Sequence, residues 1–377
     1  GCMKTFLHPL QNLAEMEAIY TKAKSNRGIL EISGCMESQK AHLIYGLSGL
    51  FTSHLILAED EKAAKELYED YRFYDKNVYY YPAKDLLFFQ ADIHGNLLIR
   101  QRMRVIKALL EQKENITVVT SIDGCMDYLQ PFDKIEKQLI HFRNDSTLDM
   151  DKLKDALVHM GYERVGQVEM PGQFSVRGGI VDIYSLTEEN PWRIELWGDE
   201  IDSIRTFDSQ SQRSLENLDE IMIYPATEQP AEKGGVSFLD YFAEKNSLVF
   251  LDEPNRLEEN ARAVEEEFRQ SCENRQQKGE ENISQNWMCR WEDLNHKLNN
   301  RNCISVSLME PKRADWKITE QFNLTVKSMS SYQSSFELLV KDLRQYKKQG
   351  YQIVLLSGSR TRAERLAKDL QDEGLSA

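Results

Sequence analysis

Residues Gly34 to Ala41 have a spacing that can bind phosphate, but several of the groups that this chemistry needs are replaced. A P-loop has the pattern Gly-x-x-x-x-Gly-Lys-Ser/Thr: backbone N–H groups wrap the phosphates, the lysine contacts the β and γ oxygens, and the hydroxyl holds Mg²⁺. Gly34 and Lys40 fit this pattern. Gln39, however, replaces the second glycine, and Ala41 replaces the hydroxyl. Glu37 adds a negative charge where the phosphates would lie. The segment is therefore interpreted as a degenerate nucleotide loop.

A second segment with a possible role in nucleotide chemistry is the apolar run 248–251, which Asp252 and Glu253 follow. An apolar strand that ends in Asp-Glu is typical of the element that holds Mg²⁺ and activates water in nucleotide motors. Without the loop hydroxyl, the metal would lack one of its usual ligands. We interpret the two segments as the relic of an ATPase, and we predict no catalytic residue, metal or cofactor in this chain. The relic comprises Gly34, Gln39, Lys40, Ala41, Asp252 and Glu253.

The elements that would position these residues alternate short β-rich runs with helical patterns, which is typical of an α/β fold with a parallel sheet. We expect strands at 28–33, 54–58, 78–81, 116–120, 221–225, 248–251, 303–308 and 352–357. Helices are expected at 38–47, 61–71, 96–112, 335–349 and 360–374, and a long solvated helix with a mobile tail is expected within 258–286. The fold class is thus a degenerate P-loop, RecA/helicase-like parallel-sheet domain.

A small α+β domain interrupts this pattern. After a helix at about 150–160, short alternating runs separated by turns predict strands at 167–170, 173–176, 179–184, 192–197 and 201–207. We therefore predict that residues 1–125 form the first part of the α/β domain, that 126–213 form the insert and that 214–377 form the second part. The chain is expected to be truncated at its end.

Charge and composition exclude several classes of function. The chain of 377 residues has a formal net charge of −14, and duplex DNA repels such a chain unless basic residues gather on one face. This favours protein partners. No apolar run approaches the roughly 20 residues that span a bilayer, so we expect no membrane partner and a cytoplasmic location. The six cysteines and seven histidines are scattered without the spacing of a disulfide framework or a zinc site.

Three motifs occur in order within the predicted insert: Gly-x-Phe-x-Val-Arg-Gly-Gly at 172–179, Gly-Asp-Glu-Ile-Asp-Ser-Ile-Arg at 198–205 and Phe-Asp-x-x-x-Gln-Arg-Ser at 207–214. Together they resemble the second domain of UvrB and of the bacterial transcription-repair coupling factors, the Mfd family. UvrB has an intact ATP loop and a long Tyr-rich hairpin that probes damaged DNA. Here only residues 82–95 separate the strand expected at 78–81 from the next helix, which is too short for such a hairpin. The resemblance is therefore to the N-terminal UvrB-homology module of the coupling factors.

This resemblance implies a non-hydrolytic module that recruits the excision-repair protein UvrA in transcription-coupled nucleotide excision repair. In the full-length family members, downstream domains absent from this chain bind RNA polymerase and duplex DNA. They use ATP and Mg²⁺ to translocate and to displace a stalled polymerase. The resemblance also implies that the rest of the parent protein masks the UvrA-binding module until activation.

The resemblance places UvrA-contacting arginines at Arg164 and Arg177. Arginine forks onto carboxylates, and an adjacent apolar group supplies desolvated area, so both suit a docking surface. We predict that the two arginines pair with acidic groups of UvrA and that Gln173 lies at the rim. Strand alternation puts Phe174 on the opposite face from Gln173 and Arg177. Phe174 completes the predicted partner-binding set, although aromatic burial favours a place for it in the core.

Three alternatives remain open at this point. Arg177 could bridge to Asp182 or Glu195 within its own domain. The chain could be an ATPase that tolerates its altered loop. It could also be a UvrB-like DNA-binding ATPase or helicase subunit, for which the helix at 96–112 would supply a basic face. That face carries Arg100, Arg104 and Lys107.

Overall fold

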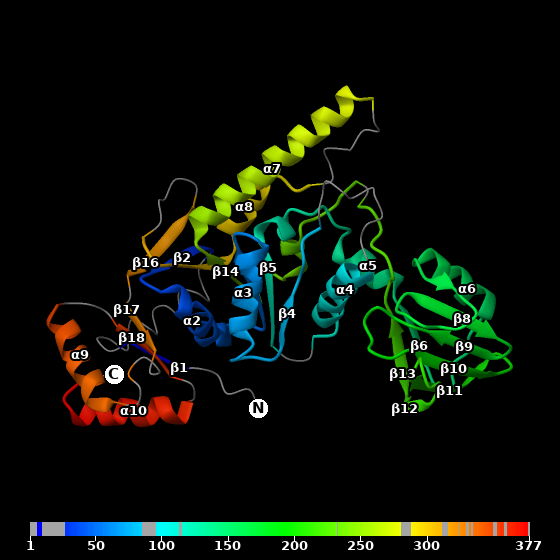
Figure 1. The fold of residues 1–377 in the computed structure, drawn as a ribbon, viewed down its shortest axis with the longest axis horizontal. Coiled ribbons are helices and arrows are strands. Elements are labelled where there is room, and N and C mark those ends of the chain that lie inside the picture. Colours follow the sequence, from blue (N-terminus) through cyan, green and yellow to red (C-terminus); the bar gives the residue numbers. More distant parts are fainter. Residues whose placement is uncertain are drawn as a thin grey trace. The chain divides into compact units, whose positions relative to one another are not determined.

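The computed structural model describes residues 6–9, 27–84, 96–112, 115–231, 233–279, 288–310, 316–323, 325–328, 332, 335–349, 353–357 and 360–375. The chain divides into two compact units, both drawn in Figure 1. The first unit comprises 1–86, 113–128 and 237–377, and the second comprises 87–112 and 129–236. By packing, the second unit is larger than the insert predicted at 126–213, because it also takes in residues 87–112 and 214–236.

A parallel sheet forms the centre of the first unit. Within the described residues its strands have the order β16-β2-β15-β14-β3-β5-β4, and every neighbouring pair is parallel. Strands covered on both faces need continuous apolar runs, which explains the patterns that predicted these strands, whereas the edge strand β16 is partly exposed and was not predicted. The prediction of a parallel-sheet α/β domain is confirmed. The strands are β2 (Gly28–Ser33), β3 (Ser53–Ala58), β4 (Val78–Tyr80), β5 (Ile116–Ser121), β14 (Ser247–Asp252), β15 (Asn302–Ser307) and β16 (Ile318–Asn323).

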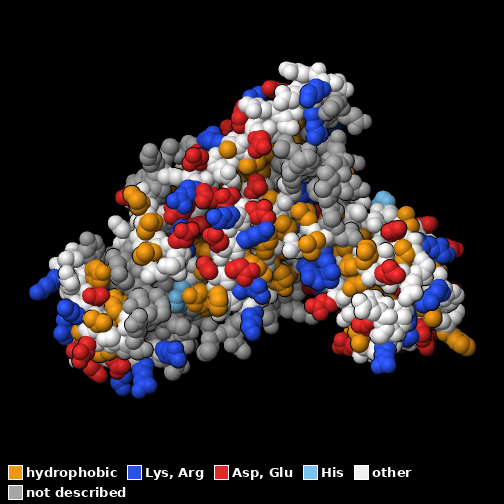
Figure 2. All heavy atoms as spheres, in the orientation of Figure 1, with side chains coloured by type: hydrophobic (Ala, Val, Ile, Leu, Met, Phe, Trp, Pro, Cys, Tyr) orange, Lys and Arg blue, Asp and Glu red, His pale blue; other side chains and the backbone are white. Residues whose placement is uncertain are grey.

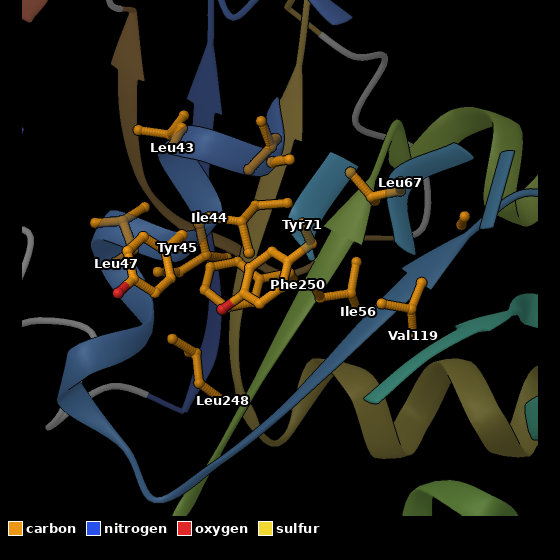
Figure 3. Packing of buried hydrophobic residues seen from close by; sticks show 14 of the residues in the cluster. Leu43, Ile44, Tyr45, Leu47, Ile56, Leu67, Tyr71, Val119, Leu248 and Phe250 are labelled. Carbon is orange, nitrogen blue, oxygen red and sulfur yellow. The ribbon is translucent and has the colours of Figure 1, made fainter. Parts of the chain in front are cut away.

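Helices pack against this sheet through one buried cluster. In Figure 3, Ile44, Tyr71 and Phe250 lie in this cluster, and they come from α2, α3 and β14. The helix α3 begins where the Asp60 side chain accepts a hydrogen bond from the Ala63 N–H at 2.8 Å, which caps its first turn. The helices of this part are α2 (Lys40–Leu47), α3 (Glu61–Tyr71), α7 (Pro254–Gln277) and α8 (Trp291–Asn299), and a short 3₁₀ turn, η1 (Glu37–Gln39), precedes α2.

The polar stretch predicted at 258–286 is helical up to Gln277, because it belongs to α7. This helix starts earlier than predicted, at Pro254, a residue that suits the first turn since it lacks an N–H. Residues 280–286 lie outside the described part of the chain. No helix among the described residues is long and apolar enough to cross a membrane.

The C-terminal part of the first unit contains a small mixed sheet of order β1-β18-β17. The helices and the strand predicted from about residue 335 onward are confirmed, with ends that differ by two residues at most. These helices and the sheet pack together through a buried cluster that includes Leu339, Leu355 and Leu370. The elements are β1 (Phe6–Pro9), β17 (Thr325–Ser328), α9 (Phe336–Lys348), β18 (Ile353–Ser357) and α10 (Arg360–Asp372).

The second unit is built on a sheet of order β12-β11-β10-β9-β8-β7, together with the strand pair β13-β6. One face of the larger sheet packs on a core that includes Leu157 of α6 and Ile194 of β10. The prediction of a small α+β domain is confirmed. Its strands are β6 (Ile140–Arg143), β7 (Glu163–Arg164), β8 (Gln173–Arg177), β9 (Ile180–Ile183), β10 (Trp192–Trp197), β11 (Glu200–Phe207), β12 (Ser214–Leu218) and β13 (Glu220–Ile223). Its helices are α4 (Asn96–Leu110), α5 (Phe132–Gln138) and α6 (Met150–His159).

The strand predicted at 167–170 is wrong. The side chain of Gln173 accepts hydrogen bonds from the N–H groups of Glu169 and Met170 at 2.9 and 3.1 Å. These N–H groups are therefore used inside a turn, and Pro171 supplies no N–H for a strand ladder. Eight elements of the described residues carry weak patterns and were not predicted: α5, α8, β1, β6, β7, β12, β16 and β17.

Candidate functional site

The degenerate loop lies where the sequence predicts it, between β2 and α2. Lys40 is buried, and its Nζ lies 2.7 Å from Asp252 Oδ1 and 2.9 Å from Glu253 Oε1. Burial by itself would lower the pKa of Lys40, but the two carboxylates outweigh this effect and raise it. The lysine is therefore charged, and it forms ion pairs with the two acidic residues that would otherwise bind a metal ion and activate water.

The backbone N–H groups of the loop also form hydrogen bonds within the chain. The N–H of Gly34 donates to the carbonyl of Leu308 at 3.0 Å, and the N–H of Cys35 donates to that of Ser307 at 3.2 Å. In a working P-loop such N–H groups point at phosphates. Gln39 has φ −110° and ψ −8°, values that any residue adopts, and the side chain of Ala41 is buried. The loop thus needs no glycine at its second conserved position.

Glu253 connects Lys40 to the end of β15 through its side chain and its backbone. It has a left-handed backbone, with φ 52° and ψ 76°, which is strained for a residue with a side chain. Its N–H donates to Val306 O at 3.0 Å, and its Oε1 accepts from the Leu308 N–H at 3.0 Å. These bonds and the ion pair with Lys40 hold the strained conformation. The described part of the chain has no group of three or more His, Cys, Asp and Glu side chains that could hold a metal ion.

The second predicted site is the polar face of the six-stranded sheet. Asp182, of which only 4% of the side chain is exposed, accepts two hydrogen bonds from Arg193, at 2.8 and 2.9 Å. The Arg193 guanidinium lies 4.2 Å from the centroid of the Phe207 ring. On the same face, Arg205 donates to Glu195 at 2.8 Å, and this hydrogen bond lowers the pKa of Glu195. Each carboxylate is thus matched by one guanidinium.

Arg177 is a third guanidinium on this face. Its Nη2 lies 3.7 Å from Asp182 Oδ2, and 55% of its side chain is exposed. The alternative that Arg177 bridges to Asp182 is therefore found, but as a long contact with a carboxylate that Arg193 already binds at two points. By strand pairing, Glu163 and Glu200 belong to this face as well, so its charge is mixed. Of the three arginines on this face, Arg177 has the longest contact with a carboxylate.

The structure separates the two predicted docking arginines. Arg164 pairs with Phe174 in the β7–β8 ladder, and Glu163 pairs with Gln173. Paired residues of a ladder point to the same face, so Arg164 lies on the Phe174 side and Glu163 lies on the Arg177 side. Although both arginines are exposed, they do not form one continuous surface.

The other two predicted docking residues support the site from inside. Phe174 is fully buried in the core of the unit, so it can position β8 but does not offer a contact surface. Gln173 is half-buried and holds the turn before β8 through its Oε1. Sequence reasoning missed Trp197, whose exposure of 83% is exceptional for a tryptophan. Its position just before the Gly198 turn, on a strand with clear alternation, was the available signal.

Arg100 and Lys107 of the basic face of α4 form contacts within the second unit. Arg102 is fully buried and paired with Glu228. Lys107 binds the Glu188 carboxylate at 2.8 Å, and Arg100 donates to the Glu188 carbonyl at 2.9 Å. On the coloured surface of Figure 2, Lys and Arg side chains lie interspersed with Asp and Glu side chains rather than in one track. The contacts of the basic side chains of α4 within the unit, and the mixed charge of the face shown, weaken the DNA-binding alternative.

Comparison with known proteins places the arginine-bearing face in a known domain. Residues 140–228 match the family model of the UvrB interaction domain. The transcription-repair-coupling factor of Bacillus subtilis (strain 168) is 28% identical over 92% of this chain and 35% of its own length. That of Staphylococcus haemolyticus is 26% identical over 78% of this chain and 30% of its own length. The chain thus spans about a third of the length of these curated relatives.

Residues 140–228 of the second unit are thus similar to the UvrB interaction domain, and the presence of a parallel-sheet α/β unit and a small α+β unit is consistent with a UvrB-like fold. The domain match and the relatives, which align over most of the chain, support an N-terminal module of a transcription-repair coupling factor. The resemblance that the three sequence motifs predict is confirmed.

Proposed function

We propose that this chain is a non-hydrolytic docking module that recruits UvrA in transcription-coupled nucleotide excision repair. The UvrB interaction domain at 140–228 and the names of the relatives support a role in coupling repair to transcription. One observation carries the proposal: Arg177 is half exposed on a sheet face where Asp182 and Glu195 already have other arginine partners.

The ion pairs of this face leave Arg177 available to an acidic partner. The pair of Asp182 and Arg193 is nearly buried and bidentate, so it stays closed when a partner arrives. The contact of Arg177 with Asp182 is long and partly exposed, and such contacts contribute only about 0–1 kcal/mol. Arg177 can therefore turn to a carboxylate of UvrA at little cost. Arg164 lies on the opposite face and would contact UvrA only around the β7 edge.

The degenerate loop supports the absence of hydrolysis. Lys40 binds Asp252 and Glu253, and the N–H groups of Gly34 and Cys35 bind carbonyls of the chain. A nucleotide would have to break these contacts and would still find no loop hydroxyl for Mg²⁺ at Ala41. We infer that this network replaces a bound nucleotide as the connection between the two segments.

The remaining activities are proposed for the full-length parent. Its downstream domains would bind RNA polymerase and duplex DNA, and they would use ATP and Mg²⁺ to displace a stalled polymerase. The rest of the parent would mask the UvrA-binding face until activation, and the protein would act in the cytoplasm. The names of the relatives support the coupling of transcription to repair in this proposal.

A titration of the chain with purified UvrA tests the proposal, with ATP binding measured alongside. We expect saturable binding of UvrA and no Mg²⁺-dependent binding of ATP. Arg177→Ala should weaken UvrA binding at least tenfold, or about 1.4 kcal/mol. Arg143→Ala is the matched control, because Arg143 is similarly exposed and has a similar contact, 3.6 Å from Glu220. Equal affinities of both variants and the wild type, or no binding of UvrA, would contradict the proposal.

A further inference from the structure

Trp197 is an exposed tryptophan in a unit whose core is otherwise well packed. Its exposure is 83%, whereas the other tryptophans within the described residues are nearly buried: Trp192 at 3%, Trp291 at 2% and Trp316 at 6%. An exposed indole offers a large apolar area, and its burial by a partner would contribute favourable free energy to binding. Tryptophan and arginine are also the residues that most often dominate the binding energy of protein interfaces.

The alternation of β10 places Trp197 on the polar face of the sheet. Ile194 and Leu196 pack against the core, so Glu195 and Trp197 point the other way. The strand ends there, because Gly198 adopts φ 62° and turns the chain into β11. Trp197 therefore stands at the end of the strand, on the face that carries Arg193 and Arg177.

The ladder between β8, β9 and β10 places this tryptophan at the same end of the sheet face as Arg177, two strands away. Arg177 pairs with Ile180, and Ile180 pairs with Glu195. One step further along, the N–H of Leu196 donates to the carbonyl of Gly179 at 2.8 Å. Trp197 thus directly follows a residue bonded to the turn that begins after Arg177. A cation and an aromatic ring share one end of one sheet face.

The turn between the two side chains leaves the backbone accessible. Gly178 adopts φ 58°, and a Cβ built on it would meet nothing within 4 Å. A partner can therefore approach the end of this face closely, with the guanidinium and the indole on either side of the turn. This arrangement matches an interface centre in which an apolar anchor lies beside a charged one.

We propose that Trp197 is the apolar anchor of the surface that docks UvrA and that Arg177 is its polar anchor. The inference rests on the proposed function, since it takes UvrA as the occupant. It adds the chemistry of the complementary site: an apolar pocket that accepts the indole, with a carboxylate at its rim for Arg177. The long contact of Arg177 with Asp182 leaves the Arg177 guanidinium available to such a carboxylate.

Calorimetric titration of the full chain with purified UvrA tests the assignment. Trp197→Ala should weaken binding at least about thirtyfold, as removal of a central anchor does. Trp197→Phe should keep most of the affinity, because it retains an aromatic ring. Val158→Ala removes another exposed apolar side chain of the same unit and should leave the affinity unchanged. The thermal unfolding of all three variants should match the wild type, since both positions are exposed.

A spectroscopic readout reports the contact directly. The difference between the fluorescence of the wild type and that of Trp197→Phe isolates the emission of Trp197. This emission should shift to shorter wavelength when UvrA covers the indole.

The outcomes separate this inference from the proposed function. If the wild type does not bind UvrA, the proposed function fails. If the wild type binds and Arg177→Ala weakens binding while Trp197→Ala does not, only the role of Trp197 is wrong. A loss of self-association in Trp197→Ala, with unchanged UvrA affinity, would assign the face to a second copy of the chain and would also overturn the inference.

Discussion

The ammonium of Lys40 lies 2.7 Å from the carboxylate of Asp252, a residue 212 positions later in the chain. In a nucleotide motor, the corresponding lysine contacts phosphate and the corresponding acid serves Mg²⁺. Here the two side chains bind each other, and Glu253 joins them at 2.9 Å. An internal ion pair therefore connects the loop after β2 to the end of β14, where a nucleotide and its metal would otherwise connect them.

The first prediction concerns the stability that this network contributes. Lys40→Met removes the only cation that contacts Asp252 and Glu253 among the hydrogen bonds and ion pairs of the described residues. Removing one partner of a buried pair leaves an uncompensated charge and destabilises by about 3–5 kcal/mol. We therefore expect a loss of about 3 kcal/mol in the free energy of unfolding, measured by urea denaturation.

Lys65→Met provides the control for this measurement. Lys65 also forms an ion pair, with Glu61 at 2.6 Å, but both side chains are more than half exposed. Exposed pairs within one helix contribute only about 0.3–0.5 kcal/mol, so this variant should unfold almost as the wild type does. Equal stabilities of the two variants would show that the Lys40 network does not hold the loop.

The second prediction concerns restoration of the P-loop. The double variant Gln39→Gly, Ala41→Ser recreates the glycine and the hydroxyl of the pattern. We expect no Mg²⁺-dependent ATP binding, because Lys40 and the N–H groups of Gly34 and Cys35 stay committed to partners within the chain. Equilibrium titration with a fluorescent ATP analogue measures this. Micromolar ATP binding that disappears when Mg²⁺ is omitted would contradict this. It would show that the loss of the second glycine and of the hydroxyl is by itself the reason that the site does not bind ATP.

The third prediction concerns the role of Arg193 in keeping Arg177 available. In Arg193→Met, the Asp182 carboxylate loses both of its close hydrogen bonds, and Arg177 is the nearest remaining cation. We expect Arg177 to move onto Asp182, so that UvrA binding weakens although Arg177 itself is unchanged. The affinity for UvrA, measured by the same titration, should fall about tenfold.

A second substitution separates this effect from simple unfolding. Arg193→Met combined with Asp182→Asn removes the charge that would capture Arg177 and should restore most of the UvrA affinity. If the double variant binds as poorly as Arg193→Met while its thermal unfolding stays cooperative, Arg193 acts in some other way. Thermal unfolding of both variants therefore belongs to the experiment.

The main elements of the fold followed from local pattern. Buried parallel strands need continuous apolar runs, so 28–33, 54–58, 116–120 and 248–251 could be located without the structure. The three motifs between 172 and 214 were long and specific enough to predict the class of the second domain. The run at 167–170 failed because a side chain, that of Gln173, takes up its N–H groups.

The sequence by itself determined the parallel-sheet α/β core, the small α+β domain and the loss of the loop hydroxyl at Ala41, because each depends on the residues of one short segment. Only the tertiary structure decided which side chains meet. The capture of Lys40 by Asp252 requires that β2 and β14 end at the same edge of one sheet. The separation of Arg164 from Arg177 depends on the pairing of β7 with β8, and a shift of that pairing by one residue would reverse it.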